Sequence, residues 1–160
     1  MIYDILKYGG LFILLVLFQG LMLNNVEIGG YVVPFLYVVF ILALPFDTPN
    51  WLVLILGFVL GVFIDCFVST LGMHTSATLV MAFCRAYLLK LITPRGGYEF
   101  NSKPNIQHMG LTWYLLYAVV LVFIHHMFLF YIESFKLTQF FYTFWRAISS
   151  TFFTVVLILI

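Results

Sequence analysis

Long apolar segments recur along the whole sequence, separated by short polar stretches, and this pattern constrains the fold more than any other feature. A membrane-spanning helix needs about 20 mostly apolar residues, with roughly 17 as the practical minimum. Hydrophobic residues make up 64% of the chain and charged residues only 8%, which is about a third of the charge of a typical soluble domain. Because so few polar groups cannot cover a water-exposed surface, the sequence predicts an integral membrane protein.

The length rule divides the chain into six predicted membrane helices within one domain, residues 1–160. A transmembrane β-barrel would instead show segments of about ten residues with alternating polarity. The predicted fold class is therefore all-α, a bundle of six transmembrane helices. Pro49 opens the third helix after a tight turn, so the second and third helices are expected to be neighbours. The predicted helices are Ile5–Leu23, Gly30–Phe46, Asn50–Phe67, Gly72–Ile92, Met109–Ile132 and Thr138–Ile160.

Basic residues mark one side of the predicted topology. Lys7 lies at the amino end, and the largest loop, residues 93–108, is flanked or occupied by Lys90, Arg95 and Lys103. Loops rich in lysine and arginine stay in the cytoplasm. Six crossings then place both termini in the cytoplasm, and Lys136, on an outer loop, is the exception.

Ionisable side chains within the predicted helices gather near the outer face. Asp65 comes about 15 residues after the third helix begins, which is a rise of roughly 22 Å. A charged group that faces lipid costs about 2.5 to 3.5 kcal/mol, so these groups should face one another or a wet cavity. We expect Arg146 to pair with Asp65 or with Glu133. The predicted outer polar cluster consists of Asp65, His74, His125, His126, Glu133 and Arg146.

Two glycines precede Asp65 on the same face of the third predicted helix. Gly57, Gly61 and Asp65 are spaced four residues apart, which places them one above the other. Small residues allow close approach of helix backbones in membranes. The sequence leaves open whether this face packs within the bundle or contacts a partner protein. Asp65 is expected to bond Arg146, His74 or loop amides and so to fix the outer surface on which a partner docks.

The remaining polar residues each have a structural interpretation. Arg85 either extends toward the inner headgroups or contacts a partner, and the sequence does not decide between these. His125 and His126 are adjacent and point about 100° apart on a helix, so they do not form the i, i+4 pair of a metal site. A hydrogen-bonded polar seam between helices explains them better.

No pattern in the sequence predicts a catalytic, cofactor or metal site. Ser69, His74 and Asp65 lie near one loop, but no nucleophile-elbow motif positions the serine for hydrolysis. The two cysteines lie in or beside apolar segments, where a disulfide or zinc site is not expected. A net charge of only +1 without a basic stripe excludes nucleic acid as a partner. The lipid bilayer is the one environment that composition alone implies.

One stretch resembles a known family. Pro34 to Pro94 contains GVFIDCFVSTLGMH, in which a GxxxGxxxD step ends at Asp65, and the stretch is similar to the bacterial rod-shape-determining MreD family in the version found in Bacteroidetes. Trp113 to Phe135, WYLLYAVVLVFIHHMFLFYIESF, resembles the paired-histidine and glutamate segment of the same subgroup. Together these segments cover well over half of the chain.

The resemblance implies a non-enzymatic component of the bacterial inner membrane that acts in cell elongation. It implies a complex with MreC, linked to the actin-like MreB and to the glycan polymerase RodA with its penicillin-binding transpeptidase. The family's fold is similar to the substrate-binding components of energy-coupling-factor transporters. An alternative function is therefore binding of a small, vitamin-type molecule for transport. A third function considered is that of an intramembrane enzyme.

Overall fold

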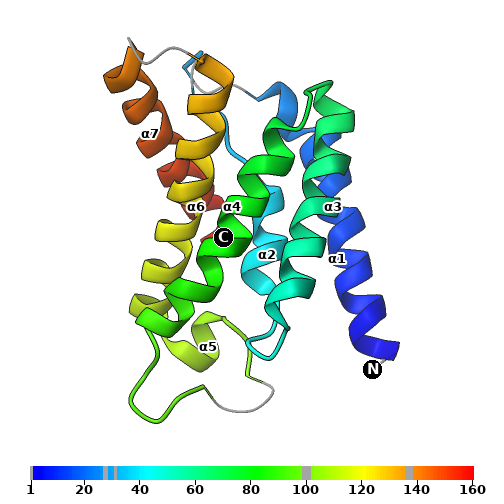
Figure 1. The fold of residues 1–160 in the computed structure, drawn as a ribbon, viewed down its shortest axis with the longest axis vertical. Helices are drawn as coiled ribbons and strands as arrows, with labels where there is room; N and C mark the ends of the chain where they lie inside the picture. Colours follow the sequence, from blue (N-terminus) through cyan, green and yellow to red (C-terminus); the bar gives the residue numbers. More distant parts are fainter. Residues whose placement is uncertain (1, 27–28, 31, 99–101, 136–138) are drawn as a thin grey trace.

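The computed structural model describes residues 2–26, 29–30, 32–98, 102–135 and 139–160. In these residues all regular secondary structure is helical, which confirms the all-α prediction (Figure 1). The long helices are α1 (Ile2–Leu21), α3 (Asn50–Val68), α4 (Met73–Leu91), α6 (Leu111–Ser134) and α7 (Phe140–Leu159). The short ones are η1 (Leu23–Asn25), η2 (Leu36–Val38), α2 (Val39–Ala43) and α5 (Ile106–Met109).

Three helices are long and apolar enough to cross a membrane, namely α3, α6 and α7. Within α1, Leu6–Leu21 forms a shorter apolar helix. These helices support the prediction of a membrane protein. The 19 residues of α4 would extend about 28 Å, but this helix carries Arg85, Lys90 and several hydroxyl side chains. The count of six crossings stays a prediction.

The predicted helix Gly30–Phe46 is wrong over its first part. Residues 33–35 are not helical, and the helix that follows consists of three residues in η2 and five in α2. Pro34 explains the break, because it has no N–H to donate and disfavours helical geometry in the residue before it. The short helix rises only about 12 to 14 Å, so a crossing here would also need the non-helical residues on either side of it.

The other predicted bounds lie within a few residues of the observed ones, as far as the structure describes them. The predicted loop 93–108 holds one element that the sequence did not indicate, the short helix α5. Asn105 precedes it, and its side-chain oxygen accepts the N–H of His108 at 2.8 Å. Lys136 and Thr138, which belong to the predicted outer loop and to the sixth helix, lie outside the described residues.

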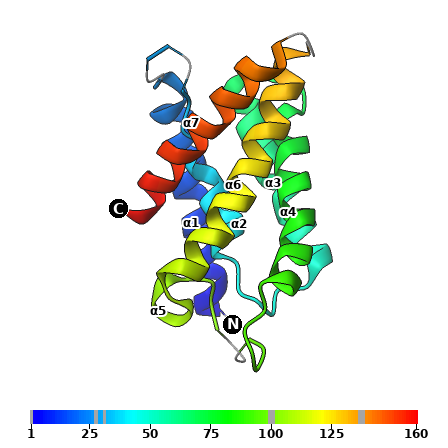
Figure 2. The ribbon, with the colours of Figure 1, turned by 90° about the vertical axis from the view of Figure 1, so that its left-hand side faces the viewer.

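The helices surround η2 and α2, which lie in the middle of the bundle (Figures 1 and 2). α3 packs along α4, α4 along α6, and α6 along α7, while α1 contacts α3, η2 and α2. Figure 2 shows α7 running obliquely across the bundle. We call the end that holds the turn between α3 and α4 the upper end, and the end that holds α5 the lower end.

The short central helices are the most deeply buried part of the molecule. Tyr37, Val38, Ile41 and Leu42 have no exposed surface. An element of this kind cannot face lipid, and its backbone groups must be satisfied by the helices around it. The sequence predicted a lipid-spanning helix here, whereas the structure uses the segment as a core.

Candidate functional site

Asp65 caps the beginning of α4 from the neighbouring helix α3. Its carboxylate accepts the backbone N–H groups of His74 at 3.0 Å and Thr75 at 2.9 Å. It also accepts the hydroxyls of Thr75 at 2.6 Å and Thr70 at 2.5 Å. Gly72, at the N-cap position, has no side chain to fill this role. The first N–H groups of a helix lack partners within it and carry positive partial charge, so a carboxylate is well suited to this site.

The two glycines before Asp65 allow α3 and α4 to touch. A Cβ on Gly61 would lie 2.3 Å from the Cα of Thr75, and one on Gly57 would lie 3.2 Å from the Cβ of Ala82. The hydroxyl of Thr78 donates to the carbonyl of Gly57 at 2.9 Å. The face that runs from Gly57 to Asp65 is therefore occupied by α4 of the same chain.

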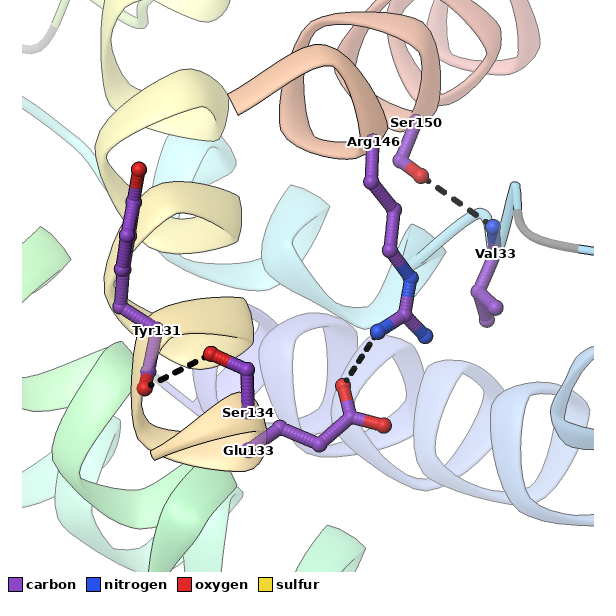
Figure 3. A network of polar contacts seen from close by, with 6 residues as sticks. All are labelled: Val33, Tyr131, Glu133, Ser134, Arg146 and Ser150. Carbon is purple, nitrogen blue, oxygen red and sulfur yellow. Dashed lines mark hydrogen bonds and ion pairs between the residues drawn. The ribbon is translucent and has the colours of Figure 1, made fainter. Parts of the chain in front are cut away.

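Arg146 forms an ion pair with Glu133, which is one of the two pairings expected from the sequence. Nη1 of Arg146 donates to Glu133 Oε2 at 2.9 Å, which joins α7 to α6 (Figure 3). The guanidinium also lies 4.1 Å from the centre of the Phe130 ring. The donors to the Asp65 carboxylate come instead from the turn after α3 and from α4, so the expected pairing of Asp65 with Arg146 is not the arrangement observed.

Tyr37 joins two of the predicted histidines in the buried centre of the upper half. Its hydroxyl lies 2.8 Å from Nδ1 of His74 and 2.7 Å from Nε2 of His125. A phenol has one hydrogen to donate, so it donates to one imidazole and accepts from the other. Nδ1 of His125 has no hydrogen-bond partner among the described residues. The ring of Phe35 packs against His74, with 5.3 Å between the ring centres.

His126 belongs to a second hydrogen-bonded chain. Its Nδ1 lies 2.8 Å from the carbonyl of Val122, and since a carbonyl only accepts, this nitrogen carries the hydrogen. Nε2 is then an acceptor, and the Thr154 hydroxyl donates to it at 3.3 Å. The same hydroxyl accepts the N–H of Phe35 at 3.2 Å. This chain connects α6 and α7 to the residues before η2.

We call residues 33–35 the extended segment, and side chains of two helices satisfy its backbone. The N–H of Val33 donates to the Ser150 hydroxyl of α7 at 3.2 Å (Figure 3). From α1, Gln19 donates to the carbonyl of Pro34 at 3.2 Å and accepts the N–H of Leu36 at 2.7 Å. Non-helical backbone at membrane depth persists only where such partners exist.

Sequence reasoning missed several residues that build this core. It followed ionisable side chains and glycines, whereas neutral hydroxyls and amides provide much of the hydrogen bonding. Two signals were present: Gln19 is a lone amide within a long apolar run, and the polar residues of α7 recur at helical spacing. The missed residues are Gln19, Tyr37, Thr70, Thr75, Thr78, Ser150 and Thr154.

A small polar cavity opens at the upper end above this core. Its volume is about 170 Å³, and the side chains of Thr70, His74, Glu133 and Arg146 contribute to its wall. It therefore unites polar groups from the α3–α4 turn, α4, α6 and α7. His74 connects the cavity to the buried Tyr37.

Arg85 occupies a separate position near the lower end. It is only 1% exposed, and its Nε donates to the hydroxyl of Tyr117 at 2.8 Å. Nη2 donates to the carbonyls of Leu44 at 2.6 Å and Pro45 at 3.2 Å, just after α2. The side chain thus turns inward and binds carbonyls at the end of the central helix, and the headgroup-directed orientation considered from the sequence is not observed.

Asp65 and His74 do not form the carboxylate–imidazole bond of a Ser-His-Asp triad. The Asp65 carboxylate contacts the backbone N–H of His74, while the imidazole Nδ1 bonds Tyr37. Ser69 ends α3 in a left-handed conformation at φ 58°. Across the part of the chain that the structure describes, no three His, Cys, Asp or Glu side chains are grouped as metal ligands.

Comparison with protein-family models, with curated proteins and with solved structures finds no match for this chain.

Proposed function

We propose that the chain is a non-enzymatic membrane scaffold of the MreD type, with six membrane crossings and both termini in the cytoplasm of a bacterial cell. In this proposal it binds MreC and helps to couple MreB to peptidoglycan synthesis by RodA and its transpeptidase. The proposal rests on the resemblance carried by GVFIDCFVSTLGMH and by the paired histidines.

The hydrogen bonding of the Asp65 carboxylate is the observation that best supports a scaffold. Four donors surround its carboxylate, and all four come from the turn and helix that it fixes in place. A carboxylate held in this way stabilises structure and is poorly suited to accept a proton from a substrate. The ion pair between Glu133 and Arg146 similarly ties α6 to α7. Both contacts favour a rigid upper surface of the kind that a protein partner recognises.

The size of the upper cavity favours the scaffold over the alternative of a vitamin-type transporter component. Its volume of about 170 Å³ is below the roughly 300 to 1,000 Å³ of sites for drug-sized ligands. Phe35, His74 and Tyr37 already fill the space beneath it with packed rings. A vitamin would have to displace this hydrogen-bonded core.

A lateral groove between α4 and α6 is the surface on which we place the membrane helix of MreC. Its volume is about 390 Å³, and its wall is apolar. Helices in membranes associate by close packing, and Met127 in this groove can adapt its shape to a partner. The lining residues are Val80, Phe123, Ile124, Met127, Phe128 and Tyr131.

Co-purification of MreC from detergent-solubilised membranes tests the proposal. The unaltered chain should retain MreC, and Val80→Trp should lose most of it because the indole fills the groove. Val62→Trp is the matched control, since Val62 is 38% exposed on α3, away from the groove. Both variants should keep the unfolding temperature of the parent chain. Absence of MreC from the parent preparation would reject the scaffold proposal.

Thermal unfolding with a panel of vitamins tests the alternative. A ligand that raises the unfolding temperature of the parent chain would favour transport, because binding to the folded state stabilises it. The substitution Thr70→Trp, which places an indole ring in the upper cavity, should then remove the stabilisation. No vitamin should stabilise a scaffold.

A further inference from the structure

A second cavity, lined mainly by apolar surface with a few charged and polar groups, lies at the lower end between the beginning of α3 and the end of α4. Its volume is about 240 Å³. It shares no wall residue with the upper cavity, and the arrangement proposed for MreC does not use it. The side chains and backbone that matter for its chemistry belong to Phe46, Asn50, Arg85, Lys90, Thr93 and Tyr98.

The buried guanidinium of Arg85 gives this cavity a charge that no carboxylate in the described part of the chain neutralises. Its bonds go to a phenol and to two carbonyls, which are all uncharged. Among the described residues Arg85 forms no ion pair with a carboxylate. A buried charge without a counter-ion is costly. An anion in the cavity would offset this cost.

Two further positive groups surround the same space. Lys90, also on α4, lines the same cavity as Arg85 and is exposed. The first turn of α3 begins at Asn50, and its N-cap residue Pro49 has no capping side chain. Helix N-termini bind anions through their backbone N–H groups. Lysine, arginine and helix N–H groups together are the usual donors to phosphate oxygens.

The aromatic wall of the cavity is neutral and apolar. The rings of Phe46 and Tyr98 stack with 4.1 Å between their centres. The Tyr98 hydroxyl donates to the carbonyl of Leu89 at 2.7 Å. Burial raises the pKa of the Tyr98 phenol, so the group does not repel an anion near pH 7. Such a wall accommodates the glycerol or acyl part of a lipid beside a charged headgroup.

We propose that this cavity binds a phosphate group, as presented by an anionic phospholipid of the leaflet at the lower end. Trp51 follows Asn50 directly and is 63% exposed, and exposed tryptophans mark the headgroup level of membranes. Basic pockets between membrane helices on the cytoplasmic side are typical headgroup sites. The lower cavity has an exposed tryptophan next to its wall residue Asn50, and it is basic because Arg85 and Lys90 line it.

Native mass spectrometry and thermal unfolding of the purified full chain test this proposal. The chain in neutral detergent is titrated with phosphatidylglycerol, phosphatidylcholine or inorganic phosphate. Phosphatidylglycerol should bind and raise the unfolding temperature, and phosphatidylcholine should bind at least fivefold more weakly. Lys90→Ala should weaken phosphatidylglycerol binding about fivefold, the loss of one cation near a headgroup. Lys90→Arg should restore it.

Lys7→Ala is the matched control, because it removes an equal, exposed charge predicted to lie on the same side but outside the cavity. It should change phosphatidylglycerol binding less than twofold. Equal loss in both alanine variants, or equal binding of both lipids, would overturn the proposal. Stabilisation by inorganic phosphate alone, lost in Lys90→Ala, would support the phosphate site and assign it to a free anion.

Discussion

At the scale of single residues, the environment of Asp65 explains how an acid is accommodated among apolar helices. The carboxylate is 6% exposed and accepts two backbone N–H groups and two hydroxyls. The sequence located this residue and listed loop amides and His74 among its partners. It could not select them, because the choice depends on the direction in which α4 leaves a turn ending at Gly72, where φ is +79°.

Asp65→Asn should lower the free energy of unfolding by about 1 to 3 kcal/mol. The amide oxygen can keep one set of donors, but the new NH₂ group must then face the N–H of the other set. Unfolding in mixed detergent micelles measures the change. Glu133→Gln is the comparison, because the Glu133 side chain is 47% exposed and its ion pair should contribute about 0 to 1 kcal/mol. Equal effects of the two substitutions would contradict the capping role.

Tyr37→Phe should destabilise the fold by about 1 to 3 kcal/mol, because it leaves the nitrogens of His74 and His125 without their shared partner. Equilibrium unfolding of the variant provides the measurement. A double-mutant cycle with His125→Leu separates this bond from packing. If the two substitutions are additive, the hydroxyl does not contribute through His125.

At the scale of elements, the contact between α3 and α4 depends on small residues at defined positions. The spacing of Gly57, Gly61 and Asp65 predicted a packing face and left its occupant open. The structure shows α4 of the same chain on that face. Periodicity identifies such a face, but it carries no information about which helix of similar composition packs there.

Gly61→Ala should destabilise the chain by about 1 to 3 kcal/mol, since the added methyl group would force two backbones apart. Gly57→Ala should have a smaller effect, because its nearest neighbour would be 3.2 Å away. Gly10→Ala in α1 meets nothing within 4 Å and should be neutral or stabilising by up to about 1 kcal/mol. Thermal unfolding of the three variants should follow this order, and any other order would contradict the close contact at Gly61.

The second predicted helix shows where sequence reasoning about elements failed. Residues 30–46 are apolar enough to read as a membrane span, and apolar character alone does not distinguish a lipid-facing helix from a buried one. Pro34 was the local signal for a break. The partners that make the break tolerable, Gln19 and Ser150, lie far away along the sequence, so no local pattern could reveal them.

At the scale of the whole molecule, the arrangement of helices predicts that the two ends of α4 lie on opposite sides of the membrane. Leu71, in the turn before α4, is 99% exposed. Gln107, on α5 at the lower end, is also exposed. The distribution of basic residues predicts that the lower end is cytoplasmic.

Cysteine labelling tests this topology in a variant without Cys66 and Cys84. A membrane-impermeant maleimide should label Leu71→Cys in intact cells and Gln107→Cys only after permeabilisation. Both cysteines reacting from the same side would mean that α4 does not cross. The same reagent at Lys7→Cys should report the side of the amino terminus and agree with Gln107→Cys.

The bonds from the extended segment to α7 have a consequence for how the protein is made. They join residues separated by 117 and 119 positions, so the ribosome completes these partners long after the segment itself. Until then the early N–H groups must remain hydrated, or shielded by the insertion machinery. Packing of α7 against the extended segment would thus be the step that completes the fold of a newly made chain. Pulse-chase labelling should show rapid proteolysis of a chain ended after Ile148 and slower turnover of one ended after Val155.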